Sequence, residues 1–144
     1  MRRRVLVVDD EQDILDLLTI WLDDDPRCAG SKQTADLDDA LKIAAQWQPH
    51  VVVIDYLFGH RCCTEILPEL RKELPDSVIV VHTASRRAAE SAGAVDLGAD
   101  MVLEKGHETI DTVIDQLLKA TRSVDLSALP AREGRSAPPA TGVG

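Results

Sequence analysis

Five side chains suited to phosphate and metal chemistry stand where four apolar stretches of the sequence end. The stretches are Arg4–Val8, Val51–Ile54, Val78–His82 and Met101–Leu103, and the polar residues that follow them are Asp9 and Asp10, Asp55, Thr83 and, after Glu104, Lys105. A buried carboxylate is costly unless it is neutral or paired, so strands that end on acids indicate a cation nearby. If the strands are neighbours, three acids, one hydroxyl and one ammonium meet at a small polar site.

The elements that must position these residues follow from the periodicity of the sequence. The apolar stretches are short and nearly continuous, as in parallel strands that are buried on both faces. A weaker edge strand is expected over Cys28–Thr34, and helical spacing of apolar residues predicts helices over about 11–23, 36–47, 66–74, 85–97 and 107–122. This order predicts an α/β fold, a (βα)5 doubly wound five-stranded parallel sheet with helices on both faces. Ligands bind beyond the carboxyl ends of the strands in such a sheet.

The chemistry that fits these residues is phosphoryl transfer to a carboxylate. Asp9, Asp10 and Asp55 offer the hard oxygen atoms that Mg²⁺ prefers. Asp55 is the best nucleophile because it stands alone at the end of the central strand, and carboxylate attack on a phosphoryl group gives an acyl phosphate. Lys105 then supplies a cation, and Thr83 a hydroxyl, for the oxygen atoms of the added phosphoryl group.

Four short motifs carry these residues, namely Val7–Glu11, Val53–Asp55, Val81–Ala84 and Leu103–Lys105, and a fifth motif, Leu97–Asp100, precedes the last of them. With them the chain resembles the receiver domains of two-component response regulators over about residues 4–122. The resemblance implies the flavodoxin-like strand order 2-1-3-4-5. It also implies that Asp55 accepts a phosphoryl group from a histidine kinase or a phosphotransfer protein. The chain would then be a signalling phosphoacceptor in a phosphorelay and not an enzyme, with at most slow self-phosphorylation and autodephosphorylation.

The same resemblance assigns further roles. Asp10, Asp55 and the backbone carbonyl of Leu57 would bind Mg²⁺ directly, and Asp9 would act through water. Thr83 and Lys105 would contact the phosphoryl group. Phosphorylation would change the binding of a partner or of a second copy of the chain. The resemblance implies that either would bind at the face of the fourth helix, fifth strand and fifth helix, where a homodimer is one possible outcome.

Three departures from the usual receiver pattern bear on signal output. Val102 occupies the position, three residues before the lysine, where receivers commonly carry an aromatic switch residue. Gly106 follows the lysine in place of the common Pro, and the loop after the acceptor reads Phe58–Cys63 instead of Pro and Asp-Gly. The acceptor chemistry is expected to survive, whereas switching through an aromatic rotamer is not expected.

The composition of the chain limits its possible binding partners and its cellular location. The 144 residues carry a net charge of −9 with scattered acids, which argues against direct nucleic-acid binding. We find neither a membrane span nor a signal peptide, and we expect a cytoplasmic protein.

The cysteines Cys28, Cys62 and Cys63 have no metal-binding spacing and are expected to be free thiols. The histidines His50, His60, His82 and His107 are interpreted as surface or structural residues. Residues 1–122 are predicted to form the receiver domain, and residues 123–144 a disordered Pro/Ala/Gly-rich tail or a truncated linker.

Other functions fit the sequence less well. A phosphatase of the haloacid-dehalogenase type needs a second acid two residues after the nucleophile, and that position is Leu57. A dinucleotide enzyme needs a glycine-rich turn after the first strand, where this chain has acids. The alternative that stays open is a pseudo-receiver, which keeps the fold as a protein-interaction module independent of phosphorylation.

Overall fold

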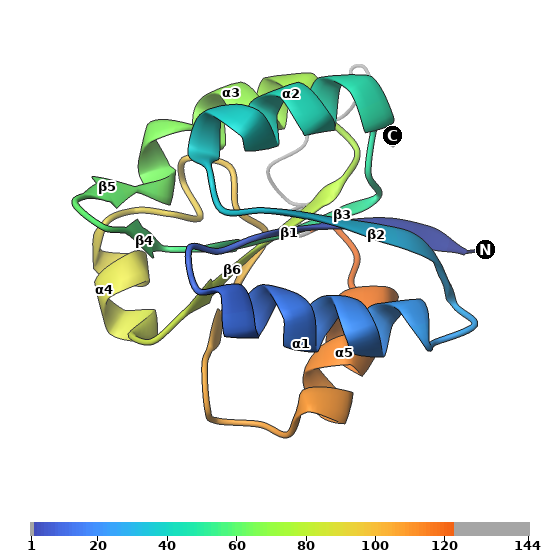
Figure 1. Cartoon of the computed structure of the whole chain (residues 1–144). Helices are drawn as coiled ribbons and strands as arrows, with labels where there is room; N and C mark the ends of the chain where they lie inside the picture. Colours follow the sequence, from blue (N-terminus) through green and yellow to red (C-terminus); the bar gives the residue numbers. More distant parts are fainter. Residues whose placement is uncertain (1, 123–144) are drawn as a thin grey trace, which may run out of the picture.

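A parallel sheet of five strands runs through the centre of the computed structural model, which describes residues 2–122 (Figure 1). In chain order these strands are β1 (Arg3–Val8), β2 (Cys28–Thr34), β3 (Val51–Asp55), β6 (Val78–Thr83) and β7 (Met101–Glu104). Their order across the sheet is β2-β1-β3-β6-β7. Counting only these strands, that is the order 2-1-3-4-5, so the predicted doubly wound α/β fold is confirmed.

Helices cover both faces of this sheet. They are α1 (Gln12–Asp23), α2 (Leu37–Trp47), α3 (Leu67–Glu73), α4 (Arg86–Ser91) and α5 (Ile110–Lys119). In Figure 1, α2 and α3 lie above the sheet, whereas α1 and α5 lie below it. Each crossover between parallel strands passes through one of these helices, as the βα rhythm of the sequence requires.

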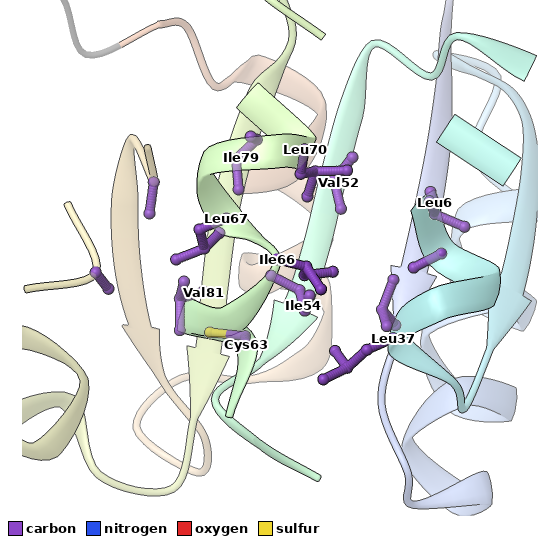
Figure 2. Packing of buried hydrophobic residues seen from close by; sticks show 14 of the residues in the cluster. Leu6, Leu37, Val52, Ile54, Cys63, Ile66, Leu67, Leu70, Ile79 and Val81 are labelled. Carbon is purple, nitrogen blue, oxygen red and sulfur yellow. The ribbon is translucent and has the colours of Figure 1, made fainter. Parts of the chain in front are cut away.

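The sheet is buried on both faces because its central strands alternate between two hydrophobic clusters. Val52 and Ile54 of β3 pack toward α2 and α3, whereas Val51 and Val53 pack toward α1 and α5. Successive side chains of a strand point to opposite faces, so a strand covered on both sides reads as a continuous apolar run. Figure 2 shows the first of these clusters, in which Cys63 lies among Ile54, Leu67 and Val81.

Two helices are shorter than their patterns predict. The predicted helix 85–97 ends as α4 at Ser91, because Gly93 adopts a φ of 77°, a left-handed conformation that does not continue an α-helix. The predicted helix 107–122 begins only at Ile110, since Thr109 before it is extended, and ends at Lys119. Both corrections concern ends of elements and leave the topology unchanged.

The loop after β3 contains an element that the sequence does not predict. Leu57–Phe58 (β4) and Arg61–Cys62 (β5) form a short antiparallel hairpin, which turns at Gly59 with a φ of 64°. The single-turn 3-10 helix η1 (Cys63–Glu65) connects this hairpin to α3. The hairpin therefore fixes the backbone that follows Asp55 directly.

None of the helices in the described part of the chain has the length and apolar character needed to cross a lipid bilayer. The predicted tail, residues 123–144, lies outside the described residues.

Candidate functional site

The carboxyl ends of the central strands bring the predicted residues to one edge of the sheet. Asp9 follows β1, Asp55 is the last residue of β3, Thr83 is the last residue of β6, and Lys105 follows β7. Asp9, Asp55 and Thr83 are buried, with exposed fractions of 2, 8 and 3%. Because β1, β3, β6 and β7 are consecutive across the sheet, four separate motifs of the sequence converge on one site.

The ammonium of Lys105 is the centre of this site. Its Nζ atom lies 2.8 Å from Oδ2 of Asp9, 3.2 Å from Oδ2 of Asp55 and 3.0 Å from Oε1 of Glu11. The backbone N–H of Lys105 donates to the carbonyl of Thr83 at 2.7 Å, which anchors the lysine to the end of β6. Lys105 thus shares one positive charge among three carboxylates.

Local hydrogen bonds orient the two buried acids. The backbone N–H of Glu11 donates to Oδ1 of Asp9 at 2.9 Å, and that of Tyr56 donates to Oδ1 of Asp55 at 2.7 Å. In each carboxylate the other oxygen, Oδ2, contacts Lys105. The side chains are therefore held by the turns that follow their own strands before any ligand is present.

The electrostatics of the site reflect a deficit of positive charge. Burial, together with the negative charge of Asp9, raises the pKa of Asp55 to about 6, although Lys105 and the N–H of Tyr56 act in the opposite direction. Burial alone would lower the pKa of Lys105, but its hydrogen bonds to Asp9 and Glu11 and the charge of Asp55 outweigh this effect and raise the pKa above its ordinary value. Three carboxylates and one ammonium leave the ionised site with two excess negative charges.

This charge and donor set fit a divalent metal ion. Oxygen atoms of Asp9, Glu11 and Asp55 lie within 4.8 Å of one another. Carboxylate oxygens at this spacing are suitable ligands for hard cations such as Mg²⁺ and Ca²⁺, and a divalent ion would balance the excess charge. The residues present therefore fit a metal ion of this class.

The structure arranges the predicted metal ligands differently from the sequence prediction in one respect. Asp10 is exposed and is not a member of this acidic group, whereas Glu11, to which we assigned no role, is a member. The signal was present in the sequence, because Glu11 completes the acidic run after β1, but a run alone does not say which side chains turn inward. Leu57 lies in the hairpin just after Asp55, with an exposed fraction of 53%.

Thr83 lies beside the acidic group but is engaged with the start of α4. Its Oγ1 accepts a hydrogen bond from the backbone N–H of Ser85 at 3.1 Å and donates to the Ser85 carbonyl at 3.4 Å. The hydroxyl is thus held by the loop that leads into α4.

Comparison with known proteins identifies the family. The family model of the response regulator receiver domain matches residues 5–118. The chain belongs to this family.

Solved receiver structures have the same fold. A response regulator protein from Burkholderia pseudomallei, crystallised with a phosphorylated aspartic acid, a calcium ion and citrate, is 25% identical, with a TM-score of 0.71 over 82% of this chain and 67% of that one. A CheY-like receiver domain protein from Methanospirillum hungatei is 20% identical, with a TM-score of 0.72 over 81% of this chain and 90% of that one. NtrX from Brucella abortus is 26% identical, with a TM-score of 0.70 over 83% of this chain, but the match spans only 27% of NtrX.

The protein is therefore a receiver domain of two-component response regulators, with an acidic pocket formed by Asp9, Glu11 and Asp55. Receiver domains are signalling phosphoacceptors.

The receiver's unusual residues have distinct structural places. Val102, at the position of the common aromatic switch residue, is 5% exposed and packs in the cluster between the sheet and α2, α3 and α4. Gly106 adopts a φ of 81°, so the chain after Lys105 turns through a left-handed conformation that Pro does not adopt. Gly106 therefore shapes the connection from the site to α5.

A histidine and two cysteines lie close to the strand end that carries Asp55. His82 pairs in register with Asp55 and is 7% exposed; its Nδ1 is buried and has no hydrogen-bond partner among the described residues. Burial and the charge of Lys105 lower the pKa of His82 to about 4, so the imidazole is neutral at neutral pH. Cys62 and Cys63 are free thiols; Cys63 is fully buried, and this burial raises its pKa.

Proposed function

We propose that this receiver accepts a phosphoryl group on Asp55 from a histidine kinase or a phosphotransfer protein of a two-component phosphorelay. One observation carries the proposal: Oδ2 of Asp55 lies 3.2 Å from the ammonium of Lys105, at the end of the central strand and beside Asp9. A carboxylate that is oriented by a backbone N–H and lies next to a fixed cation is suited to attack an anionic phosphoryl group.

The reaction forms one bond and breaks one. A carboxylate oxygen of Asp55 attacks the phosphorus atom of the phosphohistidine, the new O–P bond forms, and the P–N bond of the donor breaks. The departing imidazole keeps the electron pair of that bond and takes up a proton. Attack requires the ionised carboxylate, so the burial and the Asp9 charge that raise the pKa of Asp55 to about 6 in the metal-free protein oppose the reaction, and a cation bound beside Asp55 would favour it.

Lys105 and Thr83 are proposed to hold the product. Lys105 already contacts the Asp55 oxygen and would pair with an oxygen atom of the added phosphoryl group. The Thr83 hydroxyl would exchange its hydrogen bond with Ser85 for one to the phosphoryl group. This exchange would secure the phosphoryl group and lengthen the lifetime of the phosphorylated state.

Asp9, Asp55, Asp10 and the carbonyl of Leu57 are proposed to hold Mg²⁺, and Glu11 joins these candidates because it lies in the acidic group. When bound, Mg²⁺ supplies positive charge that offsets the charge of the phosphoryl oxygens. Asp10 would have to turn inward to take part, since its side chain is exposed.

The proposed output is a change in protein binding. Phosphorylation replaces the single negative charge of the Asp55 carboxylate by about two on the phosphoryl group. This net gain of about one negative charge, at a site that already carries an excess, biases a two-state element nearby. We place that change on the face of α4, β7 and α5, where a partner or a second copy of the chain would bind. The resemblance to receivers supports this choice.

The test is the intact mass of the protein after incubation with Mg²⁺ and acetyl phosphate. We expect one phosphoryl adduct that requires Mg²⁺ and is missing in Asp55→Asn, which keeps the size of the side chain but not its charge. Asp96→Asn, an exposed aspartate, is the matched control and should form the adduct as the wild type does. Absence of the adduct in the wild type, with acetyl phosphate and with a histidine kinase as donor, would contradict the proposal and favour the pseudo-receiver.

A further inference from the structure

Glu11 differs from the other two carboxylates that contact Lys105. The side chains of Asp9 and Asp55 are 3% and 11% exposed, and that of Lys105 is 15% exposed, whereas the side chain of Glu11 is 62% exposed. Glu11 therefore lies on the solvent side of Lys105, with the two buried acids behind it. An oxygen atom of Glu11 lies within 4.8 Å of one of Asp55, so a phosphodonor that binds at Asp55 comes close to this exposed carboxylate.

The backbone of Glu11 is fixed although its side chain is exposed. Glu11 stands at the N-cap position of α1, and its carbonyl accepts the backbone N–H groups of Ile14 and Leu15 at 3.1 and 3.2 Å. Ser, Thr, Asp and Asn at this position commonly cap the helix with their side chains, but Glu is not one of these capping residues. The Glu11 side chain makes no such capping bond and contacts Lys105 at 3.0 Å instead.

Lys105 is equally anchored at its backbone. Its N–H donates to the Thr83 carbonyl at 2.7 Å, directly after the last residue of β7. The ion pair between Glu11 and Lys105 thus joins two rigid attachment points through two flexible side chains. It can open and close without any movement of the sheet or of α1.

We propose that Glu11 is a positioning residue that holds the Lys105 ammonium in the resting receiver and must release it before Lys105 can bind the incoming phosphoryl group. The inference rests on the proposed function of Asp55 as phosphoacceptor and adds a restraint on that reaction. It goes beyond that function because Glu11, which does not itself accept the phosphoryl group, would limit the rate at which Asp55 is phosphorylated.

Two physical effects act in the same direction. Small phosphodonors such as acetyl phosphate are anions, so the exposed carboxylate of Glu11 repels them at the entrance of the site. The phosphoryl oxygens must also compete with Glu11 for the same ammonium, because Lys105 already contacts three carboxylates in the described structure and its side chain is only 15% exposed. Of the three contacts of Lys105, the one with Glu11 is the easiest to break. Asp9 and Asp55 are buried, and each is oriented by a backbone N–H of the turn that follows its strand.

The experiment compares the rate of phosphorylation by acetyl phosphate, at saturating Mg²⁺, in wild type, Glu11→Gln and Asp13→Asn. Glu11→Gln keeps the size of the side chain and removes its charge. Asp13→Asn removes a charge from the first turn of the same helix, at an exposed residue that is not among the Lys105 contacts in the described structure. Saturating Mg²⁺ separates the effect from any loss of metal affinity, because Glu11 belongs to the acidic group.

We expect Glu11→Gln to react about twofold to fivefold faster than wild type, the range that an exposed ion pair of ordinary strength supports. Asp13→Asn should react at the wild-type rate within error. An unchanged or lower rate in Glu11→Gln, with normal phosphorylation of wild type and Asp13→Asn, overturns the inference and leaves the proposed function intact. If wild type forms no adduct, the proposed function fails, and the inference fails with it.

A second measurement tests the restraint on Lys105 without any phosphorylation. Limited acetylation by acetic anhydride, read by peptide mass spectrometry in EDTA, compares Lys105 with the exposed Lys72 and Lys119 in the same sample. Glu11→Gln should increase the labelling of Lys105 relative to these two lysines, because the ammonium loses one of its three partners. Equal relative labelling in wild type and Glu11→Gln would show that the ion pair does not restrain Lys105 in solution, and would overturn the inference.

Discussion

Nζ of Lys105 lies 3.2 Å from Oδ2 of Asp55, and the same ammonium contacts the buried Asp9 at 2.8 Å. One ammonium is therefore paired with two buried carboxylates. This excess of negative charge affects the stability of the folded protein as well as the chemistry of the site. A buried carboxylate that must share its cation with another carboxylate loses the hydration that it has in the unfolded chain and is not fully compensated. Its ionised form is therefore less favourable in the folded protein than in the unfolded chain. The first two predictions follow from this imbalance.

Asp55→Asn should stabilise the metal-free protein at neutral and alkaline pH. The pKa of Asp55 is raised from 3.8 to about 6, so the native state binds the proton more tightly than the unfolded state does. The free energy of unfolding of the wild type should therefore fall as the pH rises from about 4 to about 6 and stay low above that. A pKa change of this size corresponds to about 3 kcal/mol, and we expect a gain of about 1 to 3 kcal/mol because Lys105 also loses a partner.

Urea unfolding in EDTA at a series of pH values measures this gain. The advantage of Asp55→Asn should be largest above about pH 7 and disappear below about pH 3, where the wild-type carboxyl is protonated in both states. The exposed Asp96→Asn is the control and should follow the wild-type curve. A difference between Asp55→Asn and wild type that does not change with pH would show that the ionisation of Asp55 is not its cause.

Lys105→Met should destabilise the metal-free protein and make it unusually responsive to Mg²⁺. Removal of the ammonium leaves Asp9 and Asp55 buried without their cation, which costs about 3 kcal/mol. A divalent ion that binds only the folded state restores part of this loss by mass action. Thermal unfolding with and without Mg²⁺ should show a larger rise of Tm in Lys105→Met than in wild type, with the exposed Lys72→Met as control. Equal rises of Tm would argue that the ion does not bind among these acids.

The fold and the location of the site could be predicted because one physical constraint produces both. Strands β1, β3 and β6 are covered on both faces, so their sequences are almost entirely apolar until they leave the sheet, and the first polar residue marks the edge. Asp55 is recognisable for this reason. The order of the strands in space came from the resemblance to receivers and was then confirmed by the structure.

The finer details were not predictable because they depend on side-chain direction and on weak local preferences. The acids of residues 9–11 are adjacent in sequence, and only the turn after β1 determines that Glu11, and not Asp10, reaches the group around Lys105. The hairpin of β4 and β5 has two residues in each strand, too few for a periodic pattern. The early end of α4 depends on the conformation of Gly93, in a segment whose alanine content favours a longer helix.

Asp100 should be the most sensitive polar residue at the opposite edge of the sheet. Its side chain is 4% exposed and accepts hydrogen bonds from Arg71 at 2.6 Å, from the N–H of Ile79 at 2.8 Å and from Arg122 at 3.0 Å. Asp100→Asn removes the charge that pairs both guanidinium groups, and we expect the free energy of unfolding to fall by about 3 kcal/mol. Arg122→Gln removes a half-exposed partner and should cost about 1 kcal/mol. Urea unfolding distinguishes the two, and equal losses would show that Arg71 does not depend on Asp100.

Signal output should not depend on the coupling of Thr83 to an aromatic rotamer, because Val102 has no ring to move. Val102 is 5% exposed and packs in the same cluster as Val81 and Ala89. Phosphorylation of Asp55 should therefore change the amide hydrogen exchange of α4 and α5 by the same amount in wild type and in Thr83→Ala. The Thr83 variant would lose only the contact of its hydroxyl with the phosphoryl group, which should shorten the lifetime of the phosphorylated state.

Hydrogen exchange with mass spectrometry, before and after phosphorylation, measures this difference, with the exposed Thr121→Ala as control. Both samples must reach the same phosphorylated fraction, which intact mass reports. Loss of the exchange difference in Thr83→Ala, at equal phosphorylation, would show that the hydroxyl carries the signal even beside Val102. The path would then run through the hydrogen bonds between Thr83 and Ser85 at the start of α4, which are already formed in the resting receiver.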